Sequence, residues 1–379
     1  MKRVLMLASV ASMIDQFNMS NIDLLQKMGY DVDVACNFKE GNTCSDKRIG
    51  KLRKSLDEMQ VRCYQIDFAR NIKHMRQNMR AYRQVEELMQ REHYAFCHCH
   101  SPIGGVVARI AGHRTKTRVI YTAHGFHFYK GAPLLNWLAY YPVEELLSHW
   151  TDVLITINHE DYELAQKKFK MKKLVYVPGI GVDTYREDLS QEAKNVKRDE
   201  LGIPRDAFMI TNAAEFTPNK NQKTVIEAIE KLNNPNIYFV MCGIGEKKEE
   251  LECYVKEHGL GEHIRFLGFR NDLHEILQTS DCFVLSSFRE GLSVALMEAM
   301  AEGLPVICGR IRGNVDLVED GKGGILVEVG CVQQYQKAID TLYQNRTSSN
   351  LMMGAYNKCK IEKFGIDSVL NDMREIYML

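Results

Sequence analysis

Two glutamates in the C-terminal half of the sequence, Glu290 and Glu298, stand eight positions apart in a segment suited to a ligand with many hydroxyls. Between them the chain leaves a predicted strand, turns at Gly291 and enters a predicted helix near Ser293. The first amides of a helix favour anions, so this turn can hold a phosphate. Carboxylates accept hydrogen bonds from hydroxyls, which sugars and ribose both carry. From spacing alone, a solvated glutamate beside an ordinary turn is the simpler interpretation.

A second group with the chemistry of metal ligands is the run Cys97-His98-Cys99-His100. Zinc sites usually space their ligands by two to four residues, so that one turn of chain can wrap the ion. Alternation along a predicted strand instead puts the two cysteines on one face and the two histidines on the other. We therefore expect no metal at this run, and we expect free, buried thiols in a reducing compartment.

The elements that must position these residues are short apolar runs alternating with amphipathic stretches, which indicates parallel sheets covered by helices on both faces. Helices are predicted, for example, at 18–28, 72–91 and 159–168. The predicted strands, in chain order, are Val4–Ala8, Asp31–Ala35, Arg62–Ile66, Phe96–Cys99, Val119–Thr122, Val153–Ile157, Leu174–Val177, Phe208–Ala213, Ile237–Cys242, Ile264–Phe266, Cys282–Leu285, Val306–Cys308 and Gly324–Val327.

A domain boundary is expected where Pro178-Gly179-Ile180-Gly181 interrupts the alternation and a charged, weakly apolar stretch follows at 186–206. We expect a first domain over 1–182 and a second over 183–365, with a C-terminal helix over about 366–379 packing back on the first. The predicted fold class is α/β, with two Rossmann-like doubly wound domains facing a cleft. Such sheets bind ligands beyond the carboxyl ends of their strands.

The composition is that of a folded globular protein: 379 residues, 45% apolar, 26% charged and zero net charge. Zero net charge gives no support for a nucleic-acid partner. Lys2-Arg3 and the apolar run after them resemble the start of a signal peptide, but the eleven cysteines and the immediate strand–helix pattern favour a first strand. No stretch approaches the roughly 20 apolar residues of a membrane span. We expect a cytoplasmic location, with a peripheral position at the inner face of the membrane as the alternative.

The segment from Ser286 to Val306 resembles the signature of the retaining glycosyltransferases of family four, which have the GT-B fold. It has a Glu, seven residues, a second Glu, then Ala-Met-Ala and Gly-Leu-Pro-Val. Nearly the whole chain takes part in the resemblance. Further matching segments, in order, are Thr122-Ala123-His124-Gly125, Pro178-Gly179-Ile180-Gly181-Val182-Asp183, Asn219-Lys220-Asn221, Gly243-Ile244-Gly245-Glu246, Phe266-Leu267-Gly268-Phe269-Arg270, Arg312-Gly313-Asn314 with Asp316, and Asp320-Gly321 with Gly324.

The resemblance implies roles for individual residues. Three catalytic side chains are implied: Glu290 meets the donor sugar, Lys220 neutralises the leaving diphosphate, and His124 reaches the sugar from the first domain. Glu298 would bind the ribose. The other implied donor-binding residues are Gly291, Leu292 and Ser293 at the turn, Gly245 and Glu246 in the nucleotide pocket, Phe269 and Arg270 near the base, and Glu215. Without the resemblance, a surface lysine and a histidine packed in the core are the simpler interpretations.

One position departs from the family pattern. The family usually carries an Arg about five residues before the Lys, where this chain has Glu215. A carboxylate cannot supply that contact to a diphosphate. Either another cation supplies it, with Arg289 and Arg312 as candidates, or Glu215 faces the sugar or the acceptor.

The acceptor side is expected in the first domain, where residues 126–141 are rich in aromatic and apolar side chains. A packed loop and helix explain this composition, and docking to a membrane surface explains it equally. The chain resembles the branch of the family that extends lipid-linked precursors of bacterial surface polysaccharides. The implied partners are a nucleotide-sugar donor, with UDP favoured, and a glycan or lipid-linked saccharide acceptor.

The implied reaction is a hexosyl transfer with retention of anomeric configuration, without a metal or another cofactor. Asp31-Val32-Asp33 matches the letters of a metal-binding Asp-x-Asp motif, but it lies in an early predicted strand, so we regard it as coincidence. A nucleotide-sugar epimerase or phosphorylase on the same fold and a non-catalytic sugar-binding protein stay open. An oxidoreductase is disfavoured because the loop after Val4–Ala8 contains no Gly.

Overall fold

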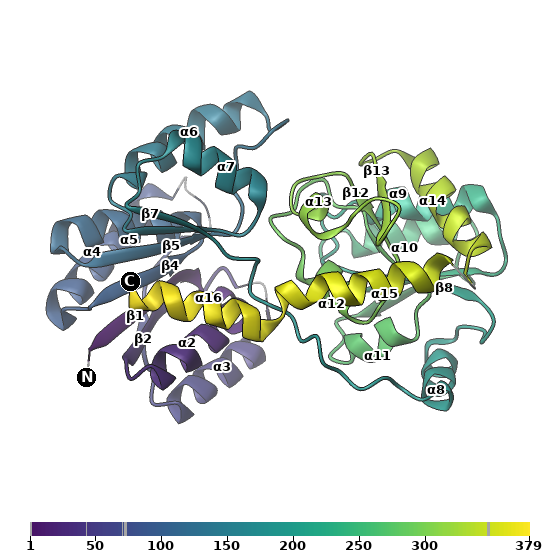
Figure 1. The fold of residues 1–379 in the computed structure, drawn as a ribbon, viewed down its shortest axis with the longest axis horizontal. Coiled ribbons are helices and arrows are strands. Elements are labelled where there is room, and N and C mark those ends of the chain that lie inside the picture. Colours follow the sequence, from purple (N-terminus) through teal and green to yellow (C-terminus); the bar gives the residue numbers. More distant parts are fainter. Residues whose placement is uncertain (1, 43, 70, 72–73, 347–348) are drawn as a thin grey trace. The chain divides into compact units, whose positions relative to one another are not determined.

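The computed structural model describes residues 2–42, 44–69, 71, 74–346 and 349–379 and divides the chain into two compact units (Figure 1). The first unit is Met1–Ile180 together with Val369–Leu379, and the second is Gly181–Ser368. Each unit is an α/β domain built on its own parallel sheet. Within the described residues, no helix is long and apolar enough to span a membrane.

The sheet of the first unit has seven strands in the order β3-β2-β1-β4-β5-β6-β7, and all neighbouring strands run parallel. The order reverses between β1 and β4, which makes the carboxyl ends of these two strands a topological switch point. The strands are β1 (Arg3–Val10), β2 (Asp31–Asn37), β3 (Arg62–Gln65), β4 (Phe96–His100), β5 (Arg118–Ala123), β6 (Val153–Thr156) and β7 (Lys173–Tyr176).

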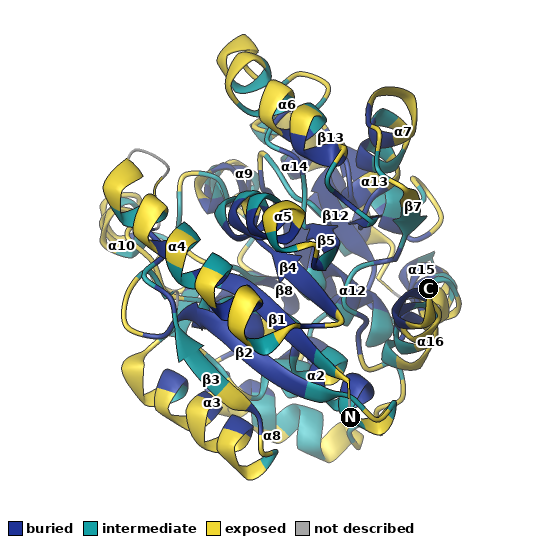
Figure 2. Cartoon of the chain, turned by 90° about the vertical axis from the view of Figure 1, so that its left-hand side faces the viewer, coloured by how far each residue is buried: buried dark blue, intermediate teal, exposed yellow. Residues whose placement is uncertain are grey.

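Two apolar cores cover the two faces of this sheet, because successive side chains of a strand point to opposite faces. In β1, Val4 and Met6 belong to one core, and Leu5 and Leu7 belong to the other. Strand β4 is buried throughout, and the neighbouring strands β1 and β5 are buried except at their ends (Figure 2). The helices of the unit are α1 (Ala11–Phe17), α2 (Met19–Lys27), α3 (Asp46–Glu58), α4 (Met75–Glu92), α5 (Pro102–Thr115), α6 (Leu134–Ser148) and α7 (His159–Lys168), with α16 (Ile366–Met378) from the C-terminus.

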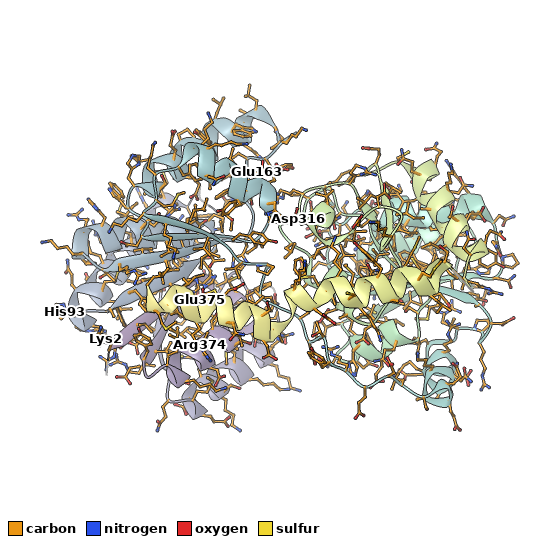
Figure 3. The ribbon with its side chains drawn as sticks, in the orientation of Figure 1. Lys2, His93, Glu163, Asp316, Arg374 and Glu375 are labelled. Carbon is orange, nitrogen blue, oxygen red and sulfur yellow. The ribbon has the colours of Figure 1, made fainter. Side chains whose placement is uncertain are left out.

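The C-terminal helix α16 has one apolar and one polar face, which explains its place on the first unit. Val369, Met373 and Tyr377 are buried in the core that also contains Val4 and Met6. Arg374 and Glu375 lie on the exposed face (Figure 3). The last part of the chain therefore completes one layer of the first unit.

The second unit has six parallel strands in the order β10-β9-β8-β11-β12-β13, with its switch point between β8 and β11. The strands are β8 (Phe208–Ala213), β9 (Ile237–Cys242), β10 (Ile264–Gly268), β11 (Cys282–Leu285), β12 (Val306–Gly309) and β13 (Gly324–Val327). The helices are α8 (Gln191–Leu201), α9 (Gln222–Leu232), α10 (Lys248–Glu257), α11 (Leu273–Gln278), α12 (Val294–Ala301), α13 (Asn314–Leu317), α14 (Val332–Gln344) and α15 (Ser349–Ile361), with a short 3-10 helix at Glu362–Phe364.

The predicted fold class of two doubly wound α/β domains is confirmed, and every predicted strand is present with ends that differ by at most two residues. Helix α7 has its predicted limits. The first two residues of the helix predicted at 72–91 lie outside the described residues. The charged stretch at 186–206 contains helix α8, which sequence analysis did not identify. Local caps explain it: the Ser190 side chain accepts from the Ala193 amide, and Gly202 ends the helix at φ +67°.

Candidate functional site

The switch point of the second unit brings together two loops that are distant in sequence. Residues 214–221 follow β8 and lead into α9, and residues 286–293 follow β11 and lead into α12. Hydrogen bonds join the loops, among them those from the Phe288 amide to the Asn219 carbonyl (2.8 Å), from the Asn219 side chain to the Arg289 carbonyl (3.0 Å), and from the Ser286 hydroxyl to the Lys220 carbonyl (2.8 Å). These hydrogen bonds therefore fix the candidate residues of the two loops relative to one another.

An ion pair also joins the two loops: the Lys220 Nζ atom lies 2.6 Å from the Glu290 Oε1 atom. Their side chains are only 24% and 12% exposed, so water screens this ion pair less than a surface pair. The two residues are 70 positions apart in the chain. The structure thus brings two of the three predicted catalytic side chains into direct contact.

The turn after Glu290 presents backbone amides at the start of α12. The Ser293 hydroxyl caps the helix by accepting from the Leu296 amide at 3.3 Å. Among the described residues, the amides of Gly291 and Leu292 have no hydrogen-bond acceptor within the protein. A turn of this kind, followed by a helix N-terminus, can receive phosphate oxygens.

A loop after β12 holds this turn in place. The Arg312 Nε atom donates to the Glu290 carbonyl at 3.2 Å, and Arg312 is buried. Gly313 has φ +77°, and a Cβ atom there would lie 2.1 Å from the Gly291 carbonyl oxygen. Only glycine permits both this backbone conformation and this close approach.

Glu298 lies inside α12, one to two turns beyond the cap. Within the described part of the chain, its half-buried carboxylate makes no hydrogen bond and no ion pair. Burial raises the pKa of Glu298 above its ordinary value, nearby Arg186 lowers the pKa, and Glu302 raises it. A partly desolvated carboxylate with unused acceptor capacity is suited to a ligand that donates hydrogen bonds.

The loop after β9 approaches the loop after β8 very closely. A Cβ atom on Gly245 would lie 2.4 Å from the Phe216 carbonyl oxygen, and one on Gly243 would lie 1.9 Å from the Ala214 carbonyl oxygen. The Phe216 amide also donates to the Ile244 carbonyl at 3.0 Å. Both glycines are therefore explained by packing of the two loops, and the neighbouring Glu246 side chain is exposed.

The two predicted donor-binding residues after β10, Phe269 and Arg270, have different surroundings from each other. Phe269 is 57% exposed. The Arg270 guanidinium donates to Asp272 Oδ1 at 2.8 Å and to Glu200 Oε1 at 2.7 Å, and these ion pairs join the loop to α8. The structure thus places Arg270 in an ion-pair network. In the sequence, only the nearby Asp272 could have indicated this network, because Glu200 is distant in the chain.

Glu215 lies two residues beyond the end of β8, in the same loop as Lys220, and it is exposed. Its carbonyl accepts from the Gln222 side chain at 3.0 Å, which fixes the backbone of the loop. Its carboxylate makes no hydrogen bond or ion pair within the described residues. The side chain is therefore available to a ligand.

His124, the third predicted catalytic residue, belongs to the first unit and follows β5. Its Nε2 atom lies 3.1 Å from the Nδ1 atom of His100, at the end of β4. Burial lowers the pKa of His124 to about 4, so the imidazole is neutral near pH 7.

The Cys-His-Cys-His run has the predicted alternation. Cys97 and Cys99 face one core, while His98 and His100 lie on the other side. Across the described chain, no three His, Cys, Asp or Glu side chains gather as metal ligands would. Sequence analysis did not find the contact of His100 with His124. Alternation placed His98 and His100 on one face of the strand, but their hydrogen-bond partners come from β5, the loop after it and α16.

Helix α6 in the first unit presents large apolar side chains outward, and it is mostly exposed (Figure 2). Its exposed leucines are Leu134 (73%), Leu135 (76%), Leu138 (66%) and Leu146 (59%). On the inner side, Trp137 and Tyr141 contact Phe128. A buried two-pronged ion pair between Arg109 and Glu144 (2.7 and 3.1 Å) also attaches the helix.

Comparison with known proteins agrees with this architecture. Residues 193–359 match the model of the glycosyl transferases group 1, and residues 18–179 match a glycosyl transferase 4-like domain. The putative glycosyltransferase EpsD of Bacillus subtilis is 33% identical over 384 residues, covering 99% of this chain and 96% of EpsD. A UDP-Gal:alpha-D-GlcNAc-diphosphoundecaprenol alpha-1,3-galactosyltransferase of Escherichia coli is 27% identical, covering 98% of this chain and 95% of that enzyme.

Solved structures share the fold at low sequence identity. HepE of Anabaena in complex with UDP has a TM-score of 0.80 at 18% identity, and the match covers 100% of both chains. A glycosyltransferase of Rickettsia africae has a TM-score of 0.79 at 17% identity, over 99% of this chain and 98% of that one. With the full-length similarity to EpsD and the two family models, these findings establish that the chain belongs to the group 1 glycosyltransferases of the GT-B fold and is a glycosyltransferase.

Proposed function

We propose that this glycosyltransferase transfers a sugar from a UDP-sugar to a glycan or lipid-linked saccharide, with retention of anomeric configuration, in the synthesis of a surface polysaccharide. The observation that carries the proposal is the Lys220–Glu290 ion pair beside the amides of Gly291 and Leu292 at the switch point. One cation, one carboxylate and a helix N-terminus there match a donor that carries phosphates and hydroxyls.

Lys220 would stabilise the diphosphate as it leaves. Negative charge builds up on the leaving group at the transition state, and a fixed cation lowers the barrier most at that point. Without the donor, Glu290 holds Lys220 at 2.6 Å, which keeps the ammonium group in position. With the donor bound, Glu290 would accept hydrogen bonds from sugar hydroxyls, and the amides of Gly291, Leu292 and Ser293 would approach the distal phosphate.

Glu298 would bind the ribose hydroxyls through its unused acceptor positions. Gly245 and Glu246 would line the nucleotide pocket. Phe269, which is exposed after β10, and Arg270 would lie near the base. Support for a uridine nucleotide comes from the E. coli relative, whose donor is UDP-Gal, and from HepE, whose structure contains UDP.

Retention requires the acceptor hydroxyl to attack from the face that the diphosphate leaves. The bond between the anomeric carbon and the phosphate oxygen breaks, the bond to the acceptor oxygen forms, and the departing phosphate oxygen takes the acceptor proton. This path needs no protein base at the anomeric carbon. His124, neutral at pH 7, would serve as a hydrogen-bonding partner of the donor sugar.

Arg312 would make the diphosphate contact that an arginine makes elsewhere in the family, and Glu215 would face another part of the ligands. Arg312 is buried against the turn that Glu290 begins, so it adds positive charge on the phosphate side. Glu215 is exposed in the Lys220 loop and would accept hydrogen bonds from the sugar or the acceptor. A carboxylate directly beside the diphosphate would oppose binding.

The exposed leucines of α6 would touch the membrane surface from which a lipid-linked acceptor is drawn. The E. coli relative supports this acceptor class, because its acceptor is a diphosphoundecaprenol-linked sugar. The attachment of α6 to the unit by aromatic contacts and the Arg109–Glu144 pair leaves its apolar outer face available.

A donor screen with the purified protein tests the proposal. Release of nucleotide from UDP-sugars, GDP-sugars and ADP-sugars is measured with and without a saccharide acceptor, and the anomeric configuration of the product is read by NMR. We expect acceptor-dependent UDP release and a product with the donor's configuration. An inverted product, or conversion of the donor to an epimer without transfer, would overturn the proposal.

A further inference from the structure

Three histidines form a row in the first unit. His98 and His100 lie on one face of β4, and their ring centroids are 4.2 Å apart. His124 follows β5, and its Nε2 atom lies 3.1 Å from Nδ1 of His100. His98 and His100 are fully buried, and His124 is half-buried.

The first histidine of the row is fixed by two hydrogen bonds. His98 Nδ1 lies 2.8 Å from the Tyr377 hydroxyl on α16, and His98 Nε2 lies 2.8 Å from the Thr122 hydroxyl on β5. Both partners are hydroxyls, which can donate or accept. These two hydrogen bonds hold the His98 ring in place, and the His100 ring packs against it.

The second histidine has one nitrogen that no protein group satisfies. His100 Nε2 is buried and lacks a hydrogen-bond partner within the described residues. The same is true of Asn21 Oδ1. His100 and Asn21 both line a cavity of about 20 Å³, together with His124 and Thr122. This volume admits one water-sized group, and such a group needs at least two polar partners.

We propose that His100 is a positioning residue for His124: its Nδ1 atom orients the His124 ring and links the tautomers of the two rings, while a water molecule between Asn21 Oδ1 and His100 Nε2 holds the His100 ring in place. The proposal rests on the proposed function, in which His124 contacts the donor sugar. It assigns a role to a residue pair, His100 and Asn21, that does not itself meet the substrate.

The physical reason is that two neutral imidazoles share one hydrogen bond. Burial lowers the pKa of both His100 and His124, so neither ring carries a second proton near pH 7. In the His100–His124 contact one nitrogen must carry the hydrogen and the other must accept it. The tautomer of His100 therefore decides whether His124 offers the sugar a hydrogen-bond donor or an acceptor at Nδ1.

Substitution at His100 tests the proposal with two readouts. In His100→Leu, we expect kcat to fall roughly tenfold, as for loss of one hydrogen bond, while KM for the donor changes little. In His100→Asn, an amide can keep a hydrogen-bonding atom near the place of Nδ1, so activity should recover in part. The ¹⁵N shifts of the imidazole rings report tautomers directly: the tautomer populations of His124 should change in His100→Leu.

Two further variants separate the possible outcomes. His263, a half-buried histidine in the second unit, also has a buried ring nitrogen without a partner in the described chain, so His263→Leu controls for loss of such a ring and should leave the His124 shifts unchanged. Asn21→Leu should change the ¹⁵N shifts of His100. An unchanged His124 tautomer in His100→Leu would overturn the inference. If His124→Gln keeps full activity, the sugar contact is wrong instead, and the shifts still decide the role of His100.

Discussion

At the scale of single residues, Glu298, the proposed ribose-binding residue, carries a cost in stability near neutral pH. Its carboxylate is partly buried, lacks a hydrogen-bond partner in the described chain, and has a raised pKa. The unfolded chain ionises this group more readily than the folded protein does. The group therefore favours folding only below its ordinary pKa of about 4.3, and that contribution is lost as the pH rises through the folded-state pKa.

Replacing Glu298 with Gln should consequently improve stability and impair donor binding. We expect Glu298→Gln to unfold at a higher temperature at pH 7, with a difference that shrinks as the pH falls below about 4. UDP affinity should weaken by about 1.5–3 kcal/mol through loss of charge-assisted hydrogen bonds to ribose. Calorimetric titration with UDP and thermal melts across pH give both quantities. Unchanged UDP affinity would remove Glu298 from the ribose site.

Lys220 should matter more for turnover than for ground-state binding. Lys220→Ala should lower kcat by roughly a hundred- to a thousandfold, about 2.7–4 kcal/mol, because the ammonium acts on charge that develops at the transition state. Steady-state kinetics with donor and acceptor varied separately measure the effect. Lys223→Ala, one turn later on α9 and paired with Glu227, is the matched control and should leave kcat unchanged.

Steady-state kinetics of Glu215→Arg, with donor and acceptor varied separately, test the role of Glu215, the residue that departs from the family pattern. If Glu215 contacts sugar or acceptor hydroxyls, the change damages catalysis severely, and this is the outcome we expect. A fully active Glu215→Arg enzyme would show that the position only borders the diphosphate.

At the scale of elements, the loop at 310–314 supports the turn after Glu290, which is proposed to receive the distal phosphate. Gly313→Ala should distort that turn, because a Cβ atom would lie 2.1 Å from the Gly291 carbonyl oxygen. We expect a loss of UDP affinity together with a lower melting temperature. Gly321→Ala is a matched control: its φ is +78°, close to the +77° of Gly313, but a Cβ there meets nothing within 4 Å. It should share the backbone strain of roughly 1 kcal/mol and retain UDP affinity.

Helix α6 is the element expected to meet the membrane. The double variant Leu135→Ser with Leu138→Ser should reduce co-sedimentation with anionic phospholipid vesicles by roughly tenfold or more, because each buried leucine contributes about 1.5–3 kcal/mol. Leu351→Ser on α15 removes an equally exposed leucine, at 70%, from the second unit and should have no effect. Equal vesicle binding by all three proteins would exclude α6 as the contact.

At the scale of the whole molecule, the proposed donor site draws its positive charge from the protein itself. In this proposal Lys220, Arg312 and the amides at the start of α12 would face the diphosphate. We therefore expect turnover to persist in excess EDTA. Loss of activity with EDTA and its recovery with manganese or magnesium would contradict the proposed donor site.

Much of this architecture follows from local sequence pattern. Strands such as β8 and β11 are short apolar runs bounded by turn residues. Such runs are typical of strands in a parallel sheet that helices cover on both faces. The turn at Gly291 and the helix start at Ser293 are likewise local, because caps act within a few residues. The charged helix α8 was missed because its apolar content is low, although its caps are present in the sequence.

Strand order and side-chain pairing depend on tertiary structure. Local pattern determined that Lys220 lies at a helix start and Glu290 in a turn, but their 2.6 Å contact across 70 residues arises only because β8 and β11 are neighbours in the sheet. His98 and Tyr377 meet across 279 residues because α16 returns to the first unit. Local pattern reports which face of an element is buried, and only the packed chain decides which distant side chain a buried polar group meets.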